Sequence, residues 1–192
     1  MNDRQESKIS LGLLIGGQSV RFGSEKYLAE LNGLPLLEHV YRAAIGFSDE
    51  VIFSVGSGVK EIDLHHDHSV IDSFPKAGPL AGIFACMEVA SNDWLLILAC
   101  DLPFITPQTL AKVIRNAKEP NQLVMCRSED GQTQPLCGCY HRSLLPVLET
   151  ALQEGKFGVH RFVDTVSNVF EVDVPSNELR NINHPDDLPT RE

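Results

Sequence analysis

Residues 9–26 read ISLGLLIGGQSVRFGSEK, an apolar run followed by a glycine-rich loop. The run Ile9 to Ile15 predicts a buried strand at the start of the chain. Glycines carry no Cβ, so the loop that follows can bring backbone N–H groups close to a phosphate. Arg21 and Lys26 would add positive charge that N–H groups lack. The stretch therefore predicts an anion cradle suited to a nucleotide.

The loop does not match the common phosphate-binding motifs. Gly17 and Gly23 are separated by five residues, whereas a Walker A loop has four and then Gly-Lys-Ser/Thr. The Gly-x-Gly-x-x-Gly pattern of dinucleotide sites is also absent from it. A flexible surface turn with two chance cations is the alternative. The position after a first strand favours the phosphate site, because ligands of open α/β sheets bind at the carboxyl ends of the strands.

Length and charge limit the possible functions. The 192 residues fit a single domain, 1–192, and the polar segment 1–8 is expected to be a disordered lead-in rather than a signal peptide. No apolar stretch is long enough for a transmembrane helix, so no membrane association is expected. A net charge of −10 argues against nonspecific binding to nucleic acid. An acidic protein that binds polyanions must concentrate its cations locally, as this loop does.

The cysteines and histidines offer two weaker metal hypotheses. The odd number of cysteines, five, and their apolar surroundings favour reduced thiols and a cytoplasmic location. The sequence Cys137-Gly138-Cys139 would place both thiols on one face of a strand, but no second pair completes a zinc site. The cluster at residues 65–68, His-His-Asp-His, lacks a matching partner and is expected to be a loop. Buried thiols and a solvated loop are therefore the favoured interpretations.

Strands and helices alternate along the chain. Strands are expected at 9–15, 50–55, 69–71, 94–99, 123–126, 135–140 and 168–172, and helices at 36–47, 79–90, 107–118, 142–153 and 159–166, with a closing segment at 179–188. Thr106 is the expected N-cap of the third helix, with Pro107 at its first position. This alternation predicts an α/β fold, a three-layer α/β/α arrangement around a mostly parallel sheet.

Two aspartates follow predicted strands. Asp101 comes directly after the most apolar strand, at the sheet edge where the glycine loop should lie. A charge there is costly unless it is paired or metal-bound, and one carboxylate with phosphate oxygens is a normal way to hold Mg²⁺. The alternative is a cap for the following turn. Asp72 could accept hydrogen bonds from a base or ribose, or it could be a turn aspartate before Pro75.

These features together resemble molybdenum cofactor guanylyltransferases. Residues 14–26 resemble the signature loop of that family. Three later blocks match in order: Gly-Pro-Leu-Ala-Gly at 78–82, Cys-Asp-Leu-Pro at 100–103, and Asn-Ile-Asn-His-Pro-Asp-Asp-Leu at 181–188. The resemblance covers nearly the whole chain and implies a Rossmann-like, nucleotide-diphospho-sugar-transferase-like fold.

The resemblance also implies roles for particular residues. The nucleotide side would comprise Leu14, Ile15, Gly16, Gly17, Lys26, Ser54, Asp72 and Asp101, with Ser54 standing where the family often has Asn. Arg21, Lys26 and Asp101 would be catalytic, and Asp101 would also bind Mg²⁺. Gln134, Pro135, Asn181 and Asn183 would lie on the pterin side.

The implied reaction is attack by the phosphate of molybdopterin on the α-phosphorus of GTP, which releases pyrophosphate. Because the attacking phosphate is already an anion, no strong general base is required, and the sequence has no obvious His–Asp or Cys–His pair. Molybdoenzyme maturation proteins are expected as further partners. Three alternatives stay open: CTP in place of GTP, a sugar-phosphate acceptor, and a nonenzymatic carrier of molybdenum cofactor.

Overall fold

The computed structural model describes residues 9–16, 25–56, 59, 62–71, 73–74 and 77–188. The predictions for the segment 1–8, for Gly17 and Arg21 in the glycine loop, and for Asp72 lie outside the described residues.

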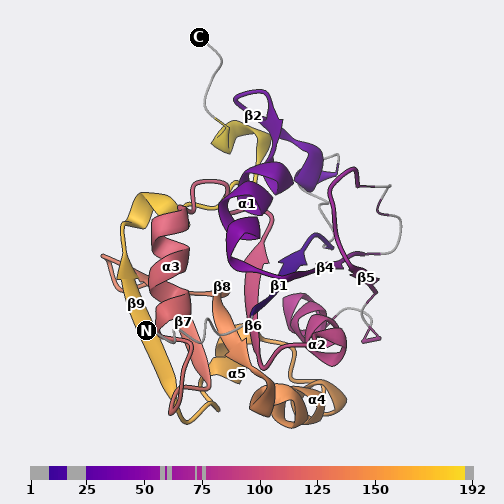
Figure 1. Ribbon diagram of the computed structural model, residues 1–192, viewed down its shortest axis with the longest axis vertical. Helices are drawn as coiled ribbons and strands as arrows, with labels where there is room; N and C mark the ends of the chain where they lie inside the picture. The colour runs from indigo at the N-terminus through magenta and orange to yellow at the C-terminus, as the bar shows by residue number, and fades with distance from the viewer. Residues whose placement is uncertain are drawn as a thin grey trace, which may run out of the picture.

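A central sheet is the main feature of the fold (Figure 1). Within the described residues it has seven strands in the order β5-β4-β1-β6-β8-β7-β9. The strands are β1 (Ile9–Leu14), β4 (Glu50–Ser54), β5 (His68–Val70), β6 (Trp94–Ala99), β7 (Leu123–Ser128), β8 (Thr133–His141) and β9 (Val169–Val174). β1 runs parallel to both β4 and β6, whereas β8 is antiparallel to β6 and β7. The predicted mostly parallel sheet is confirmed.

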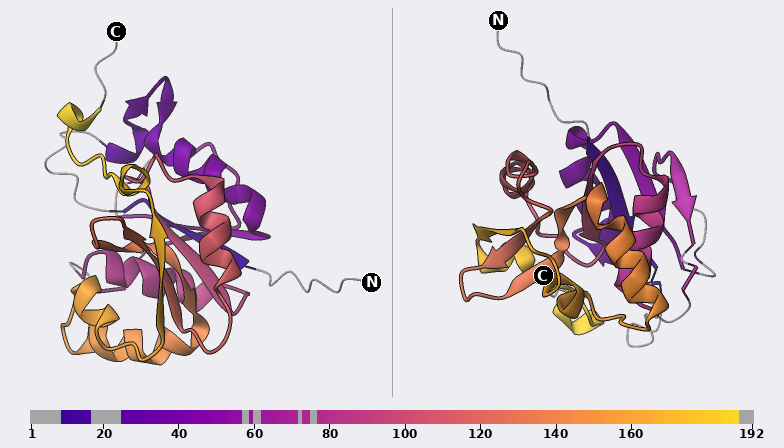
Figure 2. Two further views of the ribbon diagram at one scale, coloured as in Figure 1. Left: turned by 90° about the vertical axis from the view of Figure 1, so that its left-hand side faces the viewer. Right: turned by 90° about the horizontal axis from the view of Figure 1, so that it is seen from below.

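Helices cover both faces of this sheet (Figures 1 and 2). They are α1 (Leu36–Ala44), α2 (Pro79–Val89), α3 (Pro107–Arg115), α4 (Leu145–Gln153) and α5 (Val159–Val163), with short 3-10 turns η1 (Lys26–Leu28), η2 (Ile45–Phe47), η3 (Arg142–Leu144), η4 (Ser176–Leu179) and η5 (Pro185–Asp187). Residues of α1 and α3 pack in one hydrophobic cluster, and residues of α2, α4 and α5 pack in another. The predicted three-layer arrangement is confirmed.

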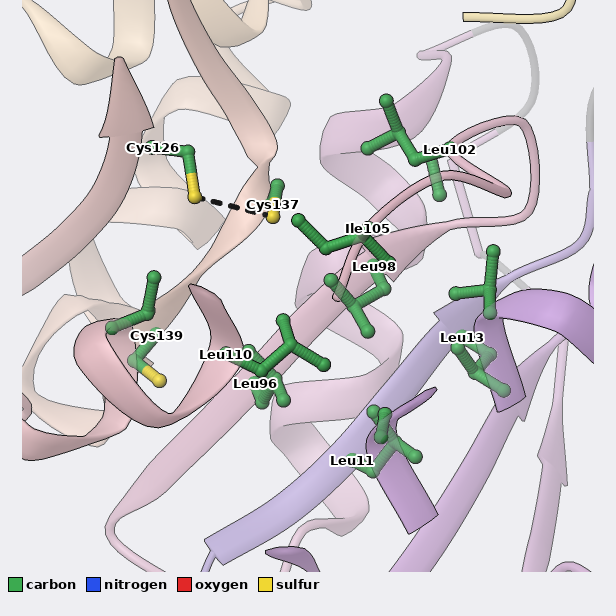
Figure 3. Close-up of a cluster of buried hydrophobic side chains, with 14 of the residues drawn as sticks. Leu11, Leu13, Leu96, Leu98, Leu102, Ile105, Leu110, Cys126, Cys137 and Cys139 are labelled. Carbon is green, nitrogen blue, oxygen red and sulfur yellow. Dashed lines mark hydrogen bonds between the residues drawn. The ribbon is translucent and has the colours of Figure 1, made fainter. Parts of the chain in front are cut away.

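Alternation along the strands supplies both clusters. In β1, Leu11 and Leu13 face the α1 and α3 side, and Leu14 faces the α2 side. Figure 3 shows the first cluster, in which Leu96 and Leu98 of β6 lie between the cysteines of β7 and β8 and the leucines of β1. The five cysteines are buried and free, as predicted, and the sulfurs of Cys126 and Cys137 are 3.4 Å apart.

Local signals explain where individual elements begin and turn. Thr106 caps α3, because its Oγ1 accepts a hydrogen bond from the backbone N–H of Thr109 at 3.2 Å. A small hairpin, β2 (Glu30–Leu31) and β3 (Leu34–Pro35), was not expected from the sequence. Its turn is Asn32-Gly33, and both residues have positive φ, as a type I′ hairpin turn requires.

A buried carboxylate joins the amino ends of neighbouring strands, far from the loop edge. Glu50, at the start of β4, accepts hydrogen bonds from the hydroxyl of Ser10 in β1 and from Ser91 Oγ at 2.8 Å and Ser91 N at 2.9 Å. Burial raises the pKa of Glu50, but these hydrogen bonds together with the nearby His68 outweigh it, and the net pKa is lowered. Glu50 thus stays ionised and connects three segments.

Among the helices that the structure describes, none has the length and apolar character needed to cross a bilayer.

Candidate nucleotide-binding site

Those predicted nucleotide-side residues that the structure describes gather at the carboxyl ends of β1, β4 and β6. Leu14 is in register with Ser54 of β4 and with Ala99 of β6. The N–H groups of Ile15 and Gly16 both donate to the carbonyl of Ser54, at 2.9 and 3.0 Å. The parallel pairing of these strands therefore brings the first residues of the loop and the end of β4 to one edge.

Gly16 lies where the chain leaves β1 and meets the loop after β4. A Cβ on Gly16 would be 2.6 Å from the backbone nitrogen of Gly56 and 3.1 Å from the carbonyl carbon of Val55. Both neighbours are backbone atoms, so a side chain here would require the loop to move. Only glycine permits this approach, which explains the residue type without invoking a ligand.

Asp101 follows β6 at the same edge and forms an ion pair with Lys26. Lys26 Nζ is 2.7 Å from Asp101 Oδ2, and the two side chains are 15% and 17% exposed. Lys26 opens the turn η1, so the far end of the glycine loop returns to the strand ends where the loop began. The expectation that Asp101 lies at the sheet edge beside the glycine loop is confirmed by this contact with Lys26.

The closing segment of the chain, residues 179–188, contacts both Lys26 and Asp101. Asn183 Oδ1 accepts a hydrogen bond from Lys26 Nζ at 2.9 Å, although the two residues are 157 positions apart. The N–H of Ile182 donates to the carbonyl of Asp101 at 3.0 Å. The side chain of Ile182 is fully buried with Leu31 of the hairpin. Figures 1 and 2 show this segment, in yellow, beside the β2–β3 hairpin.

The antiparallel direction of β8 brings the predicted pterin-side residues to the same edge. Because β8 runs opposite to β6, with Leu98 opposite Cys137, its beginning lies at the end of β6. The pairing with β7 is irregular between Met125 and Cys126, and a strand irregularity of this kind re-aims nearby side chains. Gln134 Nε2 donates to Asn181 Oδ1 at 3.1 Å.

Pro135 lies next to Gln134 and is buried. Its carbonyl accepts a hydrogen bond from the buried hydroxyl of Tyr140 at 2.8 Å. The two asparagines of the closing segment therefore have different partners: Asn181 contacts Gln134, and Asn183 contacts Lys26.

The surroundings of one carboxylate oxygen of Asp101 indicate whether the site suits a cation. Oδ1 is buried and accepts no hydrogen bond from the residues that the structure describes. Leaving a carboxylate oxygen without a partner is costly. Among the described residues, no group of three or more His, Cys, Asp or Glu side chains lies together as a metal cage would need. A single carboxylate with phosphate oxygens is the arrangement that Mg²⁺ accepts, and Asp101 fits it.

Cys100 lies beside Asp101, but its thiol is not reactive. Burial raises the pKa of the Cys100 thiol to about 12, and the negative charge of Asp101 adds to the effect. The thiol therefore stays protonated at neutral pH and cannot act as a nucleophile. Among the described residues of this edge, Lys26 and Asp101 form an ion pair.

Asp187 was not identified from the sequence as a site residue. Its Oδ2 accepts hydrogen bonds from the N–H groups of Asn183 and His184, each at 2.7 Å. The available signal was an acidic residue two positions after Pro185, in the first turn of a short helix, where a carboxylate can reach back to free N–H groups.

A model of the MobA-like NTP transferase domain matches residues 12–169. The chain belongs to the MobA-like NTP transferase family. Membership makes it a nucleotidyltransferase, and the matched region contains the end of β1, the glycine loop and Asp101.

A curated relative and two solved structures show how far the similarity extends. The molybdenum cofactor guanylyltransferase of Pseudomonas entomophila is 32% identical over 183 residues, which are 92% of this chain and 94% of the relative.

The crystal structure of molybdopterin-guanine dinucleotide biosynthesis protein A from Archaeoglobus fulgidus has a TM-score of 0.74 at 23% identity, covering 93% of this chain and 94% of that one. The 2-C-methyl-D-erythritol 4-phosphate cytidylyltransferase of Thermus thermophilus has a TM-score of 0.69 at 17% identity, covering 92% and 93%. These two likenesses confirm the nucleotide-diphospho-sugar-transferase fold expected for this MobA-like transferase.

Proposed function

We propose that this MobA-like transferase moves GMP from GTP to the terminal phosphate of molybdopterin, forming molybdopterin guanine dinucleotide and pyrophosphate. The observation that carries the proposal is the Lys26–Asp101 pair, 2.7 Å apart at the carboxyl edge of the sheet, with the second oxygen of Asp101 buried. The name of the Pseudomonas entomophila relative, a molybdenum cofactor guanylyltransferase, supports the choice of both substrates.

The reaction depends more on neutralising the negative charge of the two reactants than on acid–base catalysis. A phosphate oxygen of the acceptor would form a bond to the α-phosphorus of GTP. The bond between the α-phosphorus and the oxygen that bridges it to the β-phosphate would break. Pyrophosphate would leave with the electron pair of that bond. Both reactants are polyanions, so their repulsion must be offset. The ammonium of Lys26 would stabilise the leaving pyrophosphate, and Arg21 would add a second positive charge.

Asp101 would hold a divalent cation, Mg²⁺ in this proposal, through the oxygen that the described residues leave without a donor. Bound Mg²⁺ would neutralise charge on the phosphate oxygens. The backbone of residues 14–17, together with Ser54 and Asp72, would orient the nucleoside. Gln134, Pro135, Asn181 and Asn183 would face the acceptor, and the hydrogen bond between Gln134 and Asn181 supports their grouping.

The compartment and further partners belong to the same proposal. The five free, buried cysteines support a reducing, cytoplasmic location. Molybdoenzyme maturation proteins are proposed to receive the product.

A nucleotide screen tests the substrates. The purified protein is mixed with Mg²⁺, molybdopterin and GTP, CTP, ATP or UTP in turn, and released pyrophosphate is measured. We expect release with GTP, dependent on molybdopterin, and loss of release when Mg²⁺ is chelated.

Release with CTP alone would overturn the choice of base, which the fold does not decide, because a cytidylyltransferase shares it. Release with a sugar phosphate alone would overturn the choice of acceptor. If the protein bound molybdopterin tightly but released no pyrophosphate from any of the nucleotides, the result would favour a nonenzymatic carrier instead.

A further inference from the structure

The closing segment is held to the site edge from one side by its backbone. Ile182 donates its N–H to the carbonyl of Asp101 at 3.0 Å. Its side chain is fully buried with Leu31 and Leu36, which belong to the hairpin and to α1. The residue before Asn183 is therefore fixed by a hydrogen bond and by apolar packing.

Asp187 holds the same segment from the other side. Its Oδ2 accepts the N–H of Asn183 and the N–H of His184, each at 2.7 Å, and its own N–H donates to the carbonyl of His184 at 3.0 Å. Short bonds from N–H groups to a carboxylate are among the stronger hydrogen bonds in proteins. The two N–H donors, that of His184 first, lower the pKa of Asp187, so the carboxylate is charged at neutral pH.

Between these two anchors lies Asn183, whose side chain reaches Lys26. Asn183 is exposed, so the position of its amide depends on the backbone that carries it. Its Oδ1 accepts from Lys26 Nζ at 2.9 Å while Lys26 also pairs with Asp101 at 2.7 Å. A turn that loosened around Asn183 would release one of the two groups that orient the Lys26 ammonium.

We propose that Asp187 is a positioning residue for nucleotidyl transfer: it fixes the turn at Asn183, so that Asn183 holds Lys26 beside Asp101. The inference rests on the proposed function, since Lys26 matters as the cation for the leaving group. The hydrogen bonds of Asp187 go to backbone N–H groups rather than to Lys26 or Asp101, so its effect passes through Asn183.

The first test measures Lys26 without any substrate. The protein is treated with acetic anhydride, and the rate of Lys26 acetylation is followed by peptide mass spectrometry. Asp187→Ala is expected to raise this rate about threefold to tenfold, the range that loss of one net hydrogen bond allows. Asp186→Ala, an exposed neighbour in the same turn, should leave it unchanged. An equal rate in wild type and Asp187→Ala would overturn the proposal.

The second test measures transfer and asks whether Asp187 acts through Asn183. Asp187→Ala should lower kcat/KM about tenfold, and Asp187→Asn, which keeps an acceptor oxygen, should recover most of the loss. In an Asn183→Ala background, Asp187→Ala should cost little more, because the contact it supports is already gone. If the losses in kcat/KM were additive, Asp187 would not act through Asn183. An equal loss in Asp186→Ala would also contradict the proposal.

The two tests separate the inference from the proposed function. Absence of pyrophosphate from wild type would refute the function, and the acetylation rates would still decide whether Asp187 orders Lys26. A thermal unfolding scan of each variant identifies any that fails to fold. Should Asp187→Ala unfold, Asn183→Ala would be compared with wild type instead, and a wild-type rate of Lys26 acetylation in that variant would count against the proposal, because Asn183 would then not restrain Lys26.

Discussion

Substituting Gly16 by alanine tests the close approach at the carboxyl end of β1. The added Cβ would lie 2.6 Å from the backbone nitrogen of Gly56, whereas ordinary contact begins at 3.4 Å, so one backbone segment must shift by about 0.8 Å (3.4 minus 2.6). Such a shift would disturb the hydrogen bond from Gly16 N to Ser54 O, now 3.0 Å long. The substitution therefore perturbs the first residues of the nucleotide side directly.

The displacement lets us estimate the loss of stability and the loss of catalytic rate. Overpacking of a tight site costs about 1–3 kcal/mol, and each kcal/mol lowers Tm by about 2–4 °C in a chain of this size. Misplacement of binding groups by nearly an ångström can cost about 10²-fold in rate. We therefore expect Gly16→Ala to lower Tm by about 2–12 °C and kcat/KM for GTP by about a hundredfold.

The assay compares Gly16→Ala with Gly46→Ala by thermal unfolding and by pyrophosphate release. Gly46 is the matched control, because a Cβ there would meet nothing within 4 Å and its φ is not in the left-handed region. Gly46→Ala should behave as wild type in both measurements. Wild-type Tm and wild-type turnover in Gly16→Ala would refute the close approach of the two loops.

Three further predictions address the charged residues. Lys26→Ala should lower pyrophosphate release at saturating GTP by roughly 10²–10³-fold, as loss of a transition-state donor does, with partial recovery in Lys26→Arg; near-normal turnover would remove Lys26 from the mechanism. Asp101→Asn should raise the Mg²⁺ concentration needed for half-maximal rate by at least about tenfold, since a carboxylate ligand becomes an amide; an unchanged Mg²⁺ titration would count against Asp101 as the ligand. Glu50→Gln should lower the free energy of unfolding at pH 7, measured by urea denaturation. Because the folded-state pKa of Glu50 is lowered, its stabilisation is present above the unfolded value near 4.5 and is lost as pH falls through the folded value, so the gap between wild type and variant should narrow in acid; a gap independent of pH would contradict this.

The strands were predictable wherever apolar character was continuous. β6 has the predicted bounds, Trp94–Ala99, and β1 ends one residue earlier than predicted, at Leu14. Both strands are buried on two faces, so they read as unbroken apolar runs. The β2–β3 hairpin was missed because each of its strands has only two residues, too few for any periodicity, although Asn32-Gly33 marks its turn.

The site was predictable in part. The placement of Asp101 at the loop edge followed from a rule about parallel strands and held, since β1 and β6 are parallel neighbours. The meeting of Asn183 with Lys26 had no local signal, because 157 positions separate the two residues. The same is true of Gln134 and Asn181, which meet through the direction of β8.

The sequence alone determined the class of fold, the first strand and its glycine loop, and the presence of a cation and a carboxylate suited to a phosphate ligand. These depend on residue type and short spacing, which are local properties of the chain. The tertiary structure decided which cation meets the carboxylate, which asparagine reaches Lys26, and why Gly16 must be glycine. Each of these depends on how distant segments pack against one another, and local pattern carries no information about that.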